Sequence, residues 1–140
     1  MTVLNNQKFK FIAGDLHLNH KRIVVKDDPA FPHPRPFDSV EEHNETIIKN
    51  WNEDVTPDDK CLLTGDFAFN TGLELLSRLN GRKFGLFGNH DVKHVSQYLA
   101  YFEDINGYYV DKGRGVIFSH IPVHSCQLDG RYKFNVHYLS

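Results

Sequence analysis

Short apolar runs recur along the chain, and most are separated from the next by a segment with helical or turn character. Runs at about residues 8–14, 60–64, 83–87, 108–110, 116–119 and 132–136 predict β-strands. Helical spacing and helix-start signals predict helices at about residues 20–26, after Ser39, at 71–79 and at about 92–101. This alternation indicates an α/β fold with a largely parallel sheet.

The connecting segments carry start and stop signals. Capping-box spacing, in which a Ser or Thr is followed three residues later by a Glu, occurs at Ser39 and again at Thr71. Four prolines within residues 28–37 predict an extended loop there. Residues 111–115 are too few for a crossover between parallel strands, so the strands on either side are expected to form an antiparallel hairpin.

Five of the predicted strands end in a residue type that binds metal ions. In chain order these residues are Asp15 with His17, Asp66, Asn89 with His90, His120 and His137. Ligands of open α/β sheets bind in the crevice beyond the carboxyl ends of the strands. Five buried strands that deliver these side chains to one edge would build a metal site, in which a single carboxylate such as Asp66 could bridge two cations about 3.5–4 Å apart.

The tetrapeptide Gly88-Asn89-His90-Asp91 is the most specific of these signals. Gly88 allows a tight turn, and Asn89 offers a neutral carbonyl oxygen. His90 can act as an acid, and Asp91 is available to fix the tautomer of His90 and raise its pKa. The alternative is a plain Asn turn that caps the following helix. We favour the functional interpretation because the tetrapeptide follows an apolar strand and has companions at the other strand ends.

Nine histidines are many for a chain of this length. Six of them lie at or just after predicted strand ends: His17, His20, His90, His120, His124 and His137. His124 is a weaker candidate that could line the pocket. The other three, His33, His43 and His94, are expected to be surface or structural residues.

The bulk composition predicts a single domain spanning residues 1–140. Hydrophobic residues make up 40% of the chain and charged residues 24%, which is an ordinary globular balance. The formal net charge of -2 gives no overall positive field to attract nucleic acid or membrane. Cys61 and Cys126 are the only cysteines, which argues against a disulfide framework. With no signal-peptide pattern and no membrane-spanning run, we expect a cytoplasmic protein that does not bind membranes.

Taken in order, Gly14-Asp15-Leu16-His17, Gly65-Asp66, Gly88-Asn89-His90-Asp91 and Ser119-His120 resemble the motifs of the calcineurin-like metallophosphoesterase superfamily. The match covers about residues 9–120 and extends less closely to His137. Residues 15–20, the proline-rich loop and residues 79–83 resemble the small bacterial and phage members. The resemblance implies an α/β sandwich of two β-sheets flanked by helices, and it implies a hydrolase.

The resemblance also implies a ligand set for two divalent metal ions. Asp15 and His17 would hold the first ion, Asn89 and His120 the second, and Asp66 would bridge both. A metal-bound water, made acidic by the two ions, would attack the phosphorus of a phosphodiester or phosphomonoester in line. Mixed carboxylate, amide and imidazole donors suit Mn²⁺, with Fe, Zn²⁺ or Mg²⁺ as alternatives.

The resemblance also implies a catalytic role for His90, and the positions of nearby basic residues make them candidates for binding substrate. His90 would protonate the leaving oxygen or steady the phosphate, with Asp91 beside it. His20 could contact the phosphate or a metal-bound water, and Lys21 and Arg22 lie in a segment that could hold the phosphate of a nucleotide, nucleic acid or other ester. Arg35 lies in a neighbouring segment, but we expect it to be an ordinary solvated charge.

The sequence departs from the family pattern after the last strand. The family closes its metal set with a Gly-His-x-His motif, whereas Asn135-Val136-His137 is followed by three more residues. We therefore expect both closing histidines to be absent and the sandwich to be shortened at its C-terminus, with His137 or His124 as substitutes. An exposed sheet edge on that side could pair with a second copy, which would give a homodimer.

Two classes of function remain open. The leading interpretation is a metal-dependent phosphoesterase that uses a two-metal-activated water. The alternative is a degenerate phosphoesterase scaffold that binds a partner or nucleotide without turnover; the missing histidines favour it, and the intact Asp66 and Asn89-His90-Asp91 oppose it. A plain nucleic-acid-binding module is disfavoured because the charge is negative and no aromatic-plus-basic stripe occurs.

Overall fold

Two β-sheets and few helices make up the fold. The computed structural model describes residues 8–138. One sheet has four parallel strands in the order β1 (Phe11–Ala13), β2 (Lys60–Leu63), β3 (Arg82–Leu86) and β4 (Asp104–Asn106). The second sheet has three strands in the order β5 (Tyr108–Asp111), β6 (Val116–Ser119) and β7 (Phe134–His137), with β5 and β6 antiparallel and β6 and β7 parallel. The mixed α/β class and the β5–β6 hairpin are as the sequence predicts.

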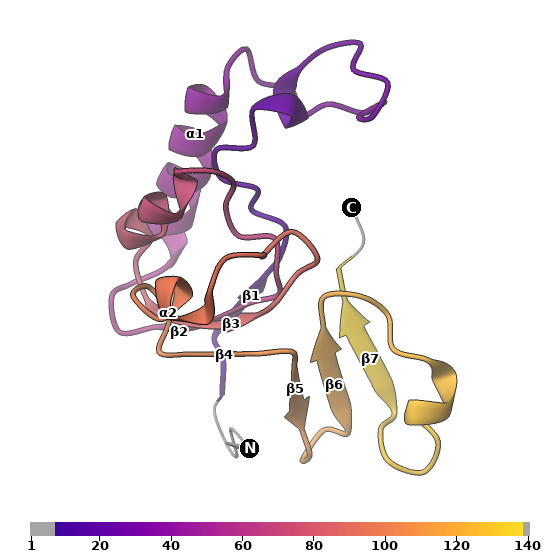
Figure 1. Cartoon of the computed structure of the whole chain (residues 1–140). Coiled ribbons are helices and arrows are strands. Elements are labelled where there is room, and N and C mark those ends of the chain that lie inside the picture. Colours follow the sequence, from indigo (N-terminus) through magenta and orange to yellow (C-terminus); the bar gives the residue numbers. More distant parts are fainter. Residues whose placement is uncertain (1–7, 139–140) are drawn as a thin grey trace.

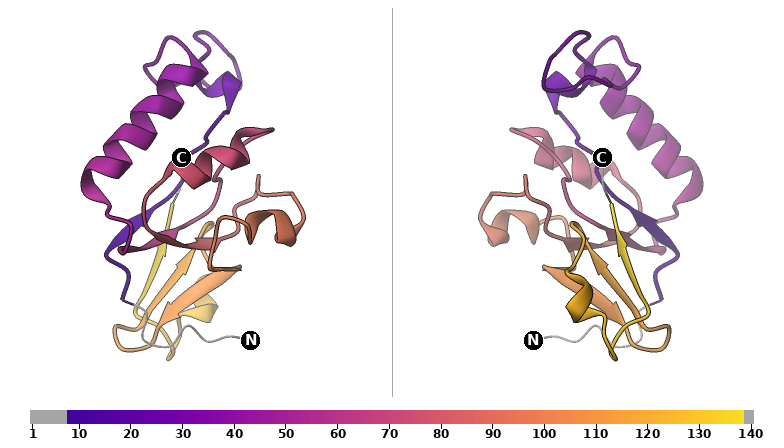
Figure 2. Two further views of the ribbon diagram at one scale, coloured as in Figure 1. Left: turned by 90° about the vertical axis from the view of Figure 1, so that its left-hand side faces the viewer. Right: turned by 90° about the vertical axis from the view of Figure 1, so that its right-hand side faces the viewer.

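The helices at residues 40–54, 72–78 and 95–98 lie on one side of the four-stranded sheet, and the three-stranded sheet lies on the other side (Figures 1 and 2). The α-helices are α1 (Val40–Asp54) and α2 (Val95–Tyr98), and the 3₁₀-helices are η1 (Lys21–Val24), η2 (Gly72–Arg78) and η3 (Ser125–Gln127). Alternating residues of β2 serve the two sides, as expected for a strand buried on both faces. Cys61 and Leu63 belong to the core on the helix side, and Leu62 belongs to the core shared with the second sheet.

Only one of the two predicted helix caps forms. The Ser39 hydroxyl accepts a hydrogen bond from the Glu42 backbone N–H at 3.0 Å, so the start of α1 is confirmed. The cap predicted at Thr71 is wrong, because η2 begins without a side-chain cap and is a 3₁₀-helix. The Thr71 hydroxyl instead accepts from the Asn19 side chain at 3.3 Å.

Several element boundaries also differ from those predicted. β1 is shorter than expected. The helix expected at 92–101 is reduced to one turn, α2, because the residues before His94 are not helical. The His94 ring caps this turn by accepting a hydrogen bond from the Ser96 N–H. β4 is not apparent in the sequence, since it has only three residues and Ile105 is its one buried side chain.

The last strand is the main departure from the expectation of five buried strands. β7 forms the outer edge of its sheet, and Phe134 and Val136 are 63% and 43% exposed. The strand contains His137 rather than ending before it. Just beyond it, Tyr138 lies so close to Gly14 that a Cβ added there would be 3.1 Å from the tyrosine. The end of β7 therefore lies beside the end of β1, while pairing of this edge with a second copy stays a prediction.

The two cysteines lie in contrasting surroundings. Cys61 is fully buried, and burial raises the pKa of its thiol to about 11. Cys126 is exposed in η3, and both are free thiols, as predicted. Between residues 8 and 138, no helix is both long enough and apolar enough to cross a membrane.

Replacing Leu62 by Ala tests the contact between the two sheets. Leu62 is fully buried, so the truncation leaves a cavity and should lower the free energy of unfolding by about 2–5 kcal/mol. Urea denaturation followed by circular dichroism measures the loss. Ile12→Ala is the control because Ile12 is 48% exposed on the neighbouring strand, and its cost should stay within about 1 kcal/mol. Equal costs would contradict the packing described here.

Candidate metal centre

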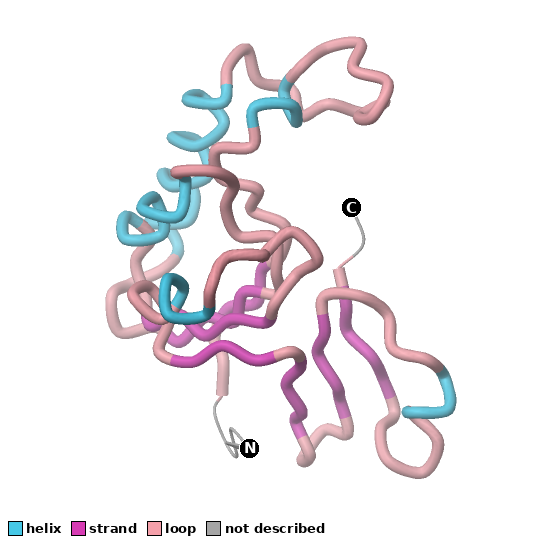
Figure 3. The backbone as a smooth tube through the Cα atoms, in the orientation of Figure 1, coloured by secondary structure: helices cyan, strands magenta, loops and turns pink. Residues whose placement is uncertain are grey.

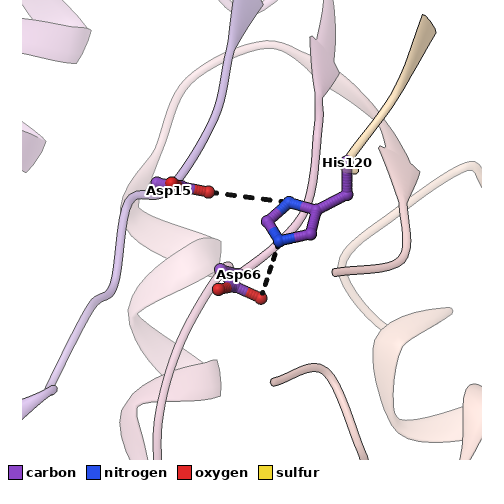
Figure 4. Close-up of side chains that lie close together, drawn as sticks. All are labelled: Asp15, Asp66 and His120. Carbon is purple, nitrogen blue, oxygen red and sulfur yellow. Dashed lines mark ion pairs between the residues drawn. The ribbon is translucent and has the colours of Figure 1, made fainter. Parts of the chain in front are cut away.

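Long loops follow the strand ends and converge between the two sheets (Figure 3). Those after β1 and β2, together with the end of β6, bring Asp15, Asp66 and His120 together (Figure 4). One potential ligand atom from each lies within 4.8 Å of the others, and all three residues are buried. His120 Nδ1 is 3.6 Å from Asp15 Oδ1, and its Nε2 is 3.6 Å from Asp66 Oδ1. The predicted donors thus meet from two sheets rather than along one edge.

Two polar atoms of this cluster are buried without a hydrogen-bond partner. They are Asp15 Oδ1 and His17 Nε2, and the latter lies 3.6 Å from Asp66 Oδ2. A buried polar atom that lacks a partner is costly and rare in folded proteins. Both atoms can offer a lone pair to a divalent cation, and carboxylate and imidazole groups are common ligands of Mn²⁺, Fe and Zn²⁺. The residues present therefore fit a metal ion.

The hydrogen bonds of His120 fix which of its nitrogens is free. Nδ1 donates to the backbone carbonyl of Thr64 at 2.8 Å, so in the neutral ring the lone pair is on Nε2. Backbone acceptors orient metal-binding histidines in this way. Nε2 lies 2.8 Å from the side-chain oxygen of Asn89, so two lone-pair donors face each other. A cation at this point would bind both, as the predicted roles of Asn89 and His120 require.

His17 is held by a neighbouring histidine. Its Nδ1 is 3.2 Å from Nδ1 of His20, whose ring stacks on Phe69 with centroids 4.0 Å apart. Burial lowers the pKa of His17 to about 4, so the ring is neutral near pH 7. When His17 donates through Nδ1, its Nε2 lone pair faces Asp66. His20 contacts a predicted metal ligand in this structure, and its predicted contact with substrate stays a prediction.

The two buried carboxylates differ in pKa. Burial raises the pKa of Asp15, and the nearby Asp66 raises it further, against the opposing effect of His120. Burial also acts to raise the pKa of Asp66, but hydrogen bonds from the His90 ring and backbone outweigh it, so this pKa lies below its usual value. Asp66 is therefore an anion near neutral pH, which suits a bridging ligand.

His90 pairs with Asp66 rather than with Asp91. Its Nδ1 lies 2.8 Å from Asp66 Oδ2, and its side chain is 51% exposed. The buried carboxylate of Asp91 instead accepts three backbone hydrogen bonds, from Asp66, Phe67 and Gly88, at 2.7, 3.1 and 2.8 Å. The expected contact in which Asp91 fixes the His90 tautomer is wrong, because these three N–H groups need an acceptor and Asp91 supplies it.

Unusual backbone conformations place the ligands. Asp15, His17 and Asp66 have φ values of 50°, 51° and 51°, a left-handed region that side chains rarely adopt. At Gly88, a Cβ would lie 2.2 Å from Asp66 Oδ1, so only glycine fits. Together these features let neighbouring strand ends approach closely enough to share a cluster.

The remaining predicted residues lie apart from Figure 4's cluster or at its border. Arg22 is exposed, and its guanidinium binds Asp28 through two contacts of 2.8 Å, so the structure does not aim it at the cluster. His124 accepts from the Cys126 N–H in η3. His137 pairs in register with Ser119, beside His120, and its Nδ1 is a third buried atom without a partner. His137 therefore stays a candidate ligand.

Sequence reasoning missed the residues that support the loop after β1. Arg35, expected to be solvated, is partly buried and donates to the backbone carbonyls of Asp15 and Leu16. His43, expected to be a surface or structural residue, is fully buried against Arg35. No local spacing signals these contacts, because they depend on how the proline-rich loop folds back.

Comparisons with known proteins find relatives without a described function. No family model matches the chain. It is 37% identical over 86 residues to the uncharacterized protein MJ1445 of Methanocaldococcus jannaschii, covering 58% of this chain and 46% of that one. It is 30% identical over 136 residues to the Gene 66 protein of Mycobacterium phage L5, covering 80% of this chain and 62% of that one.

A solved structure shares the fold. The crystal structure of the protein of unknown function AQ665 from Aquifex aeolicus matches with a TM-score of 0.63 and 27% identity, covering 79% of this chain and 59% of that one. The chain thus spans about half to three fifths of the length of the proteins that it matches.

The metal-free protein should lose stability as the pH falls from about 6.5 to about 4. In that window His17 binds a proton when unfolded but not when folded, so acid favours unfolding. The contribution of His17 is at most about 3 kcal/mol. Urea denaturation in EDTA at several pH values measures it, and His17→Asn should flatten the dependence. An unchanged slope in the variant would contradict the assignment. The raised pKa of Asp15 makes stability change with pH in the opposite sense, but Asp15 is present in both proteins, so the difference between them reports His17.

Asp91→Asn should destabilise the fold. Its amide would turn a donor toward one or more of the three backbone N–H groups, at a cost of about 3 kcal/mol. Thermal and urea unfolding measure the loss, with the exposed Asp129→Asn as the control. If the variant has normal stability but an altered pH–activity profile, Asp91 would instead act on His90, as the sequence suggested.

Proposed function

We propose that this protein is a metal-dependent phosphoesterase with a metallophosphoesterase-like sandwich fold. The observation that carries the proposal is the pair of buried, unpartnered atoms Asp15 Oδ1 and His17 Nε2, which lie against Asp66 and His120. The two sheets with helices on one face suit the proposed fold. The Asp15 to His120 motifs follow the order that the superfamily resemblance requires.

The donors divide into two groups around Asp66. Asp15 and His17 would hold one divalent ion, Asn89 and His120 a second, and the two oxygens of Asp66 would serve both. His137 is a further candidate ligand. Mn²⁺ suits this mixed donor set best, with Fe, Zn²⁺ or Mg²⁺ as alternatives. When bound, such ions polarise the phosphoryl group and lower the pKa of a coordinated water.

The role proposed for the His90 side chain is to move a proton at the leaving oxygen. Its Nδ1 is held by Asp66 at 2.8 Å, and half of its side chain is open to solvent. Its Nε2 has only a long contact of 3.5 Å, with Asn89. An imidazole held at one nitrogen and open at the other can donate a proton to an incoming ester.

A hollow of about 280 Å³ borders the cluster and can receive the group attached to the phosphate. It is lined by Phe87, Gly88, Asn89, Gly107, Ser119, His120 and Ile121. Its mixed apolar and polar walls suit an organic group. We propose a phosphodiester or phosphomonoester substrate, with nucleotides and nucleic acid among the candidates.

The purified protein should hydrolyse bis-p-nitrophenyl phosphate or p-nitrophenyl phosphate when Mn²⁺ is added, and EDTA should abolish the reaction. Asp66→Asn removes the charge of the proposed bridge and should abolish turnover together with metal binding. His90→Ala should lower kcat by about 10²–10⁴-fold when both proteins are compared at saturating Mn²⁺. The matched control is His33→Ala, because His33 is exposed in the proline-rich loop.

Two outcomes would overturn the proposal. A folded protein that binds no divalent ion by calorimetry would refute the metal centre. A protein that binds metal but turns over neither ester with Mn²⁺, Fe²⁺, Zn²⁺ or Mg²⁺ would support a scaffold that binds without catalysis.

A further inference from the structure

We propose that Arg35 is a positioning residue that fixes the backbone of residues 15–17, the segment carrying the first two proposed metal ligands, and that His43 is its required acceptor. The inference rests on the proposed metal centre, and it adds residues outside that centre. Arg35 comes from the proline-rich loop and His43 from α1, so two distant segments would act together on the loop after β1.

The guanidinium of Arg35 contacts two backbone carbonyls of this segment and one side chain of α1. Nη2 donates to the Asp15 carbonyl at 2.6 Å, and Nη1 donates to the Leu16 carbonyl at 3.0 Å. Nη1 also donates to Nε2 of His43 at 2.6 Å. Charge-assisted hydrogen bonds of this kind are roughly twice as strong as neutral ones. The contacts are made to main-chain oxygens, so they hold the backbone and leave the ligand side chains free.

The backbone that Arg35 holds is one that needs support. Asp15 and His17 both have φ values near 50°, and Asn19 has a φ of 59°. A positive φ is uncommon outside glycine, although Asp, His and Asn adopt it more often than other residues. On the inner side, His17 and Leu18 donate their N–H groups to the carbonyls of Asp66 and Phe67, both at 3.0 Å. Arg35 supplies the matching contacts on the outer side.

His43 can accept from Arg35 only when its Nε2 carries no proton. Arginine is always the donor, so the proton of the neutral imidazole is on Nδ1, which lies 3.3 Å from the side-chain oxygen of Asn44. That oxygen also accepts from the Asn19 N–H at 2.8 Å. His43 and Asn44 are buried. Helix α1 thus holds the loop at two places, through Arg35 and directly at Asn19.

Arg35 is itself fixed by the loop that carries it. Its N–H donates to the Ile23 carbonyl, and its carbonyl accepts from the Phe37 N–H, both at 2.8 Å. Pro34 and Pro36 restrict the backbone on either side. A planar fork presented from a rigid segment can bridge two carbonyls, which the single ammonium of lysine cannot reproduce.

Hydrogen exchange in the metal-free protein tests the clamp directly. Arg35→Lys keeps the charge but loses the fork, so the amides of His17 and Leu18 should exchange at least about tenfold faster than in the native protein. The matched control is Arg78→Lys, because Arg78 is an exposed arginine whose guanidinium pairs with Glu45 of α1, the helix that also carries His43. Exchange that stays unchanged in a folded Arg35→Lys variant would refute the proposal.

Mn²⁺ affinity, measured by calorimetry or electron paramagnetic resonance, tests the consequence. Supporting groups around metal ligands are worth about 10–100-fold in affinity, and Arg35→Lys should lose about that much. His43→Leu removes the acceptor and should weaken binding similarly, whereas His43→Gln keeps an acceptor oxygen and should restore it. A residue that acts only through general stability would not separate the Leu and Gln variants at equal folded fraction.

The two experiments separate this proposal from the proposed function. If the native protein binds none of Mn²⁺, Fe²⁺, Zn²⁺ and Mg²⁺, the metal centre falls, and exchange at His17 and Leu18 alone decides whether the clamp exists. If Mn²⁺ binds and Arg35→Lys and His43→Leu both bind it as tightly as the native protein, the positioning role is refuted while the metal centre stands.

Discussion

The close approach of the loops after β2 and β3 depends on one glycine and one carboxylate. Gly88 leaves no room for a Cβ beside Asp66, and Asp91 accepts backbone N–H groups from both loops. Without this junction, His90 could not reach Asp66, and Asn89 could not reach His120. The loop after β1 is tied to the same junction, because His17 donates its N–H to the Asp66 carbonyl. The backbone contacts between these loops must therefore form before the donor side chains can lie close enough to share a cation.

Much of the fold could be predicted from the sequence because its signals are local. β2 reads as a continuous apolar run since both of its faces are buried, and the Ser39 cap depends on residues only three apart. The failures have equally physical causes. β4 has a single buried side chain, Thr71 finds a distant partner in Asn19, and β7 is exposed at a sheet edge despite its apolar residues. Burial and distant contacts of this kind are set by the tertiary structure and leave no local signal.

The site divides in the same way. Asp15 and Asp66 could be found because β1 and β2 are neighbouring parallel strands that end at the same edge. His120 could be found because it also follows an apolar strand, and the structure brings it to the other two from the second sheet. The role of Asp91 could not be found from the sequence, because a carboxylate next to a histidine can turn toward either the ring or the backbone. Arg35 and His43 could not either, since their partners are main-chain atoms and each other, which leave no pattern of residue types. Support for a ligand set is harder to recognise in a sequence than the ligands are.

The contrast between the two thiols has a practical consequence. Cys61 is sealed in the core, and its raised pKa keeps it protonated near pH 7, whereas Cys126 is exposed. Reactivity toward alkylating reagents follows the accessible thiolate. The natural chain therefore offers one attachment point for a spin label or fluorophore, and distances from that label to a paramagnetic ion could be measured without engineering a cysteine.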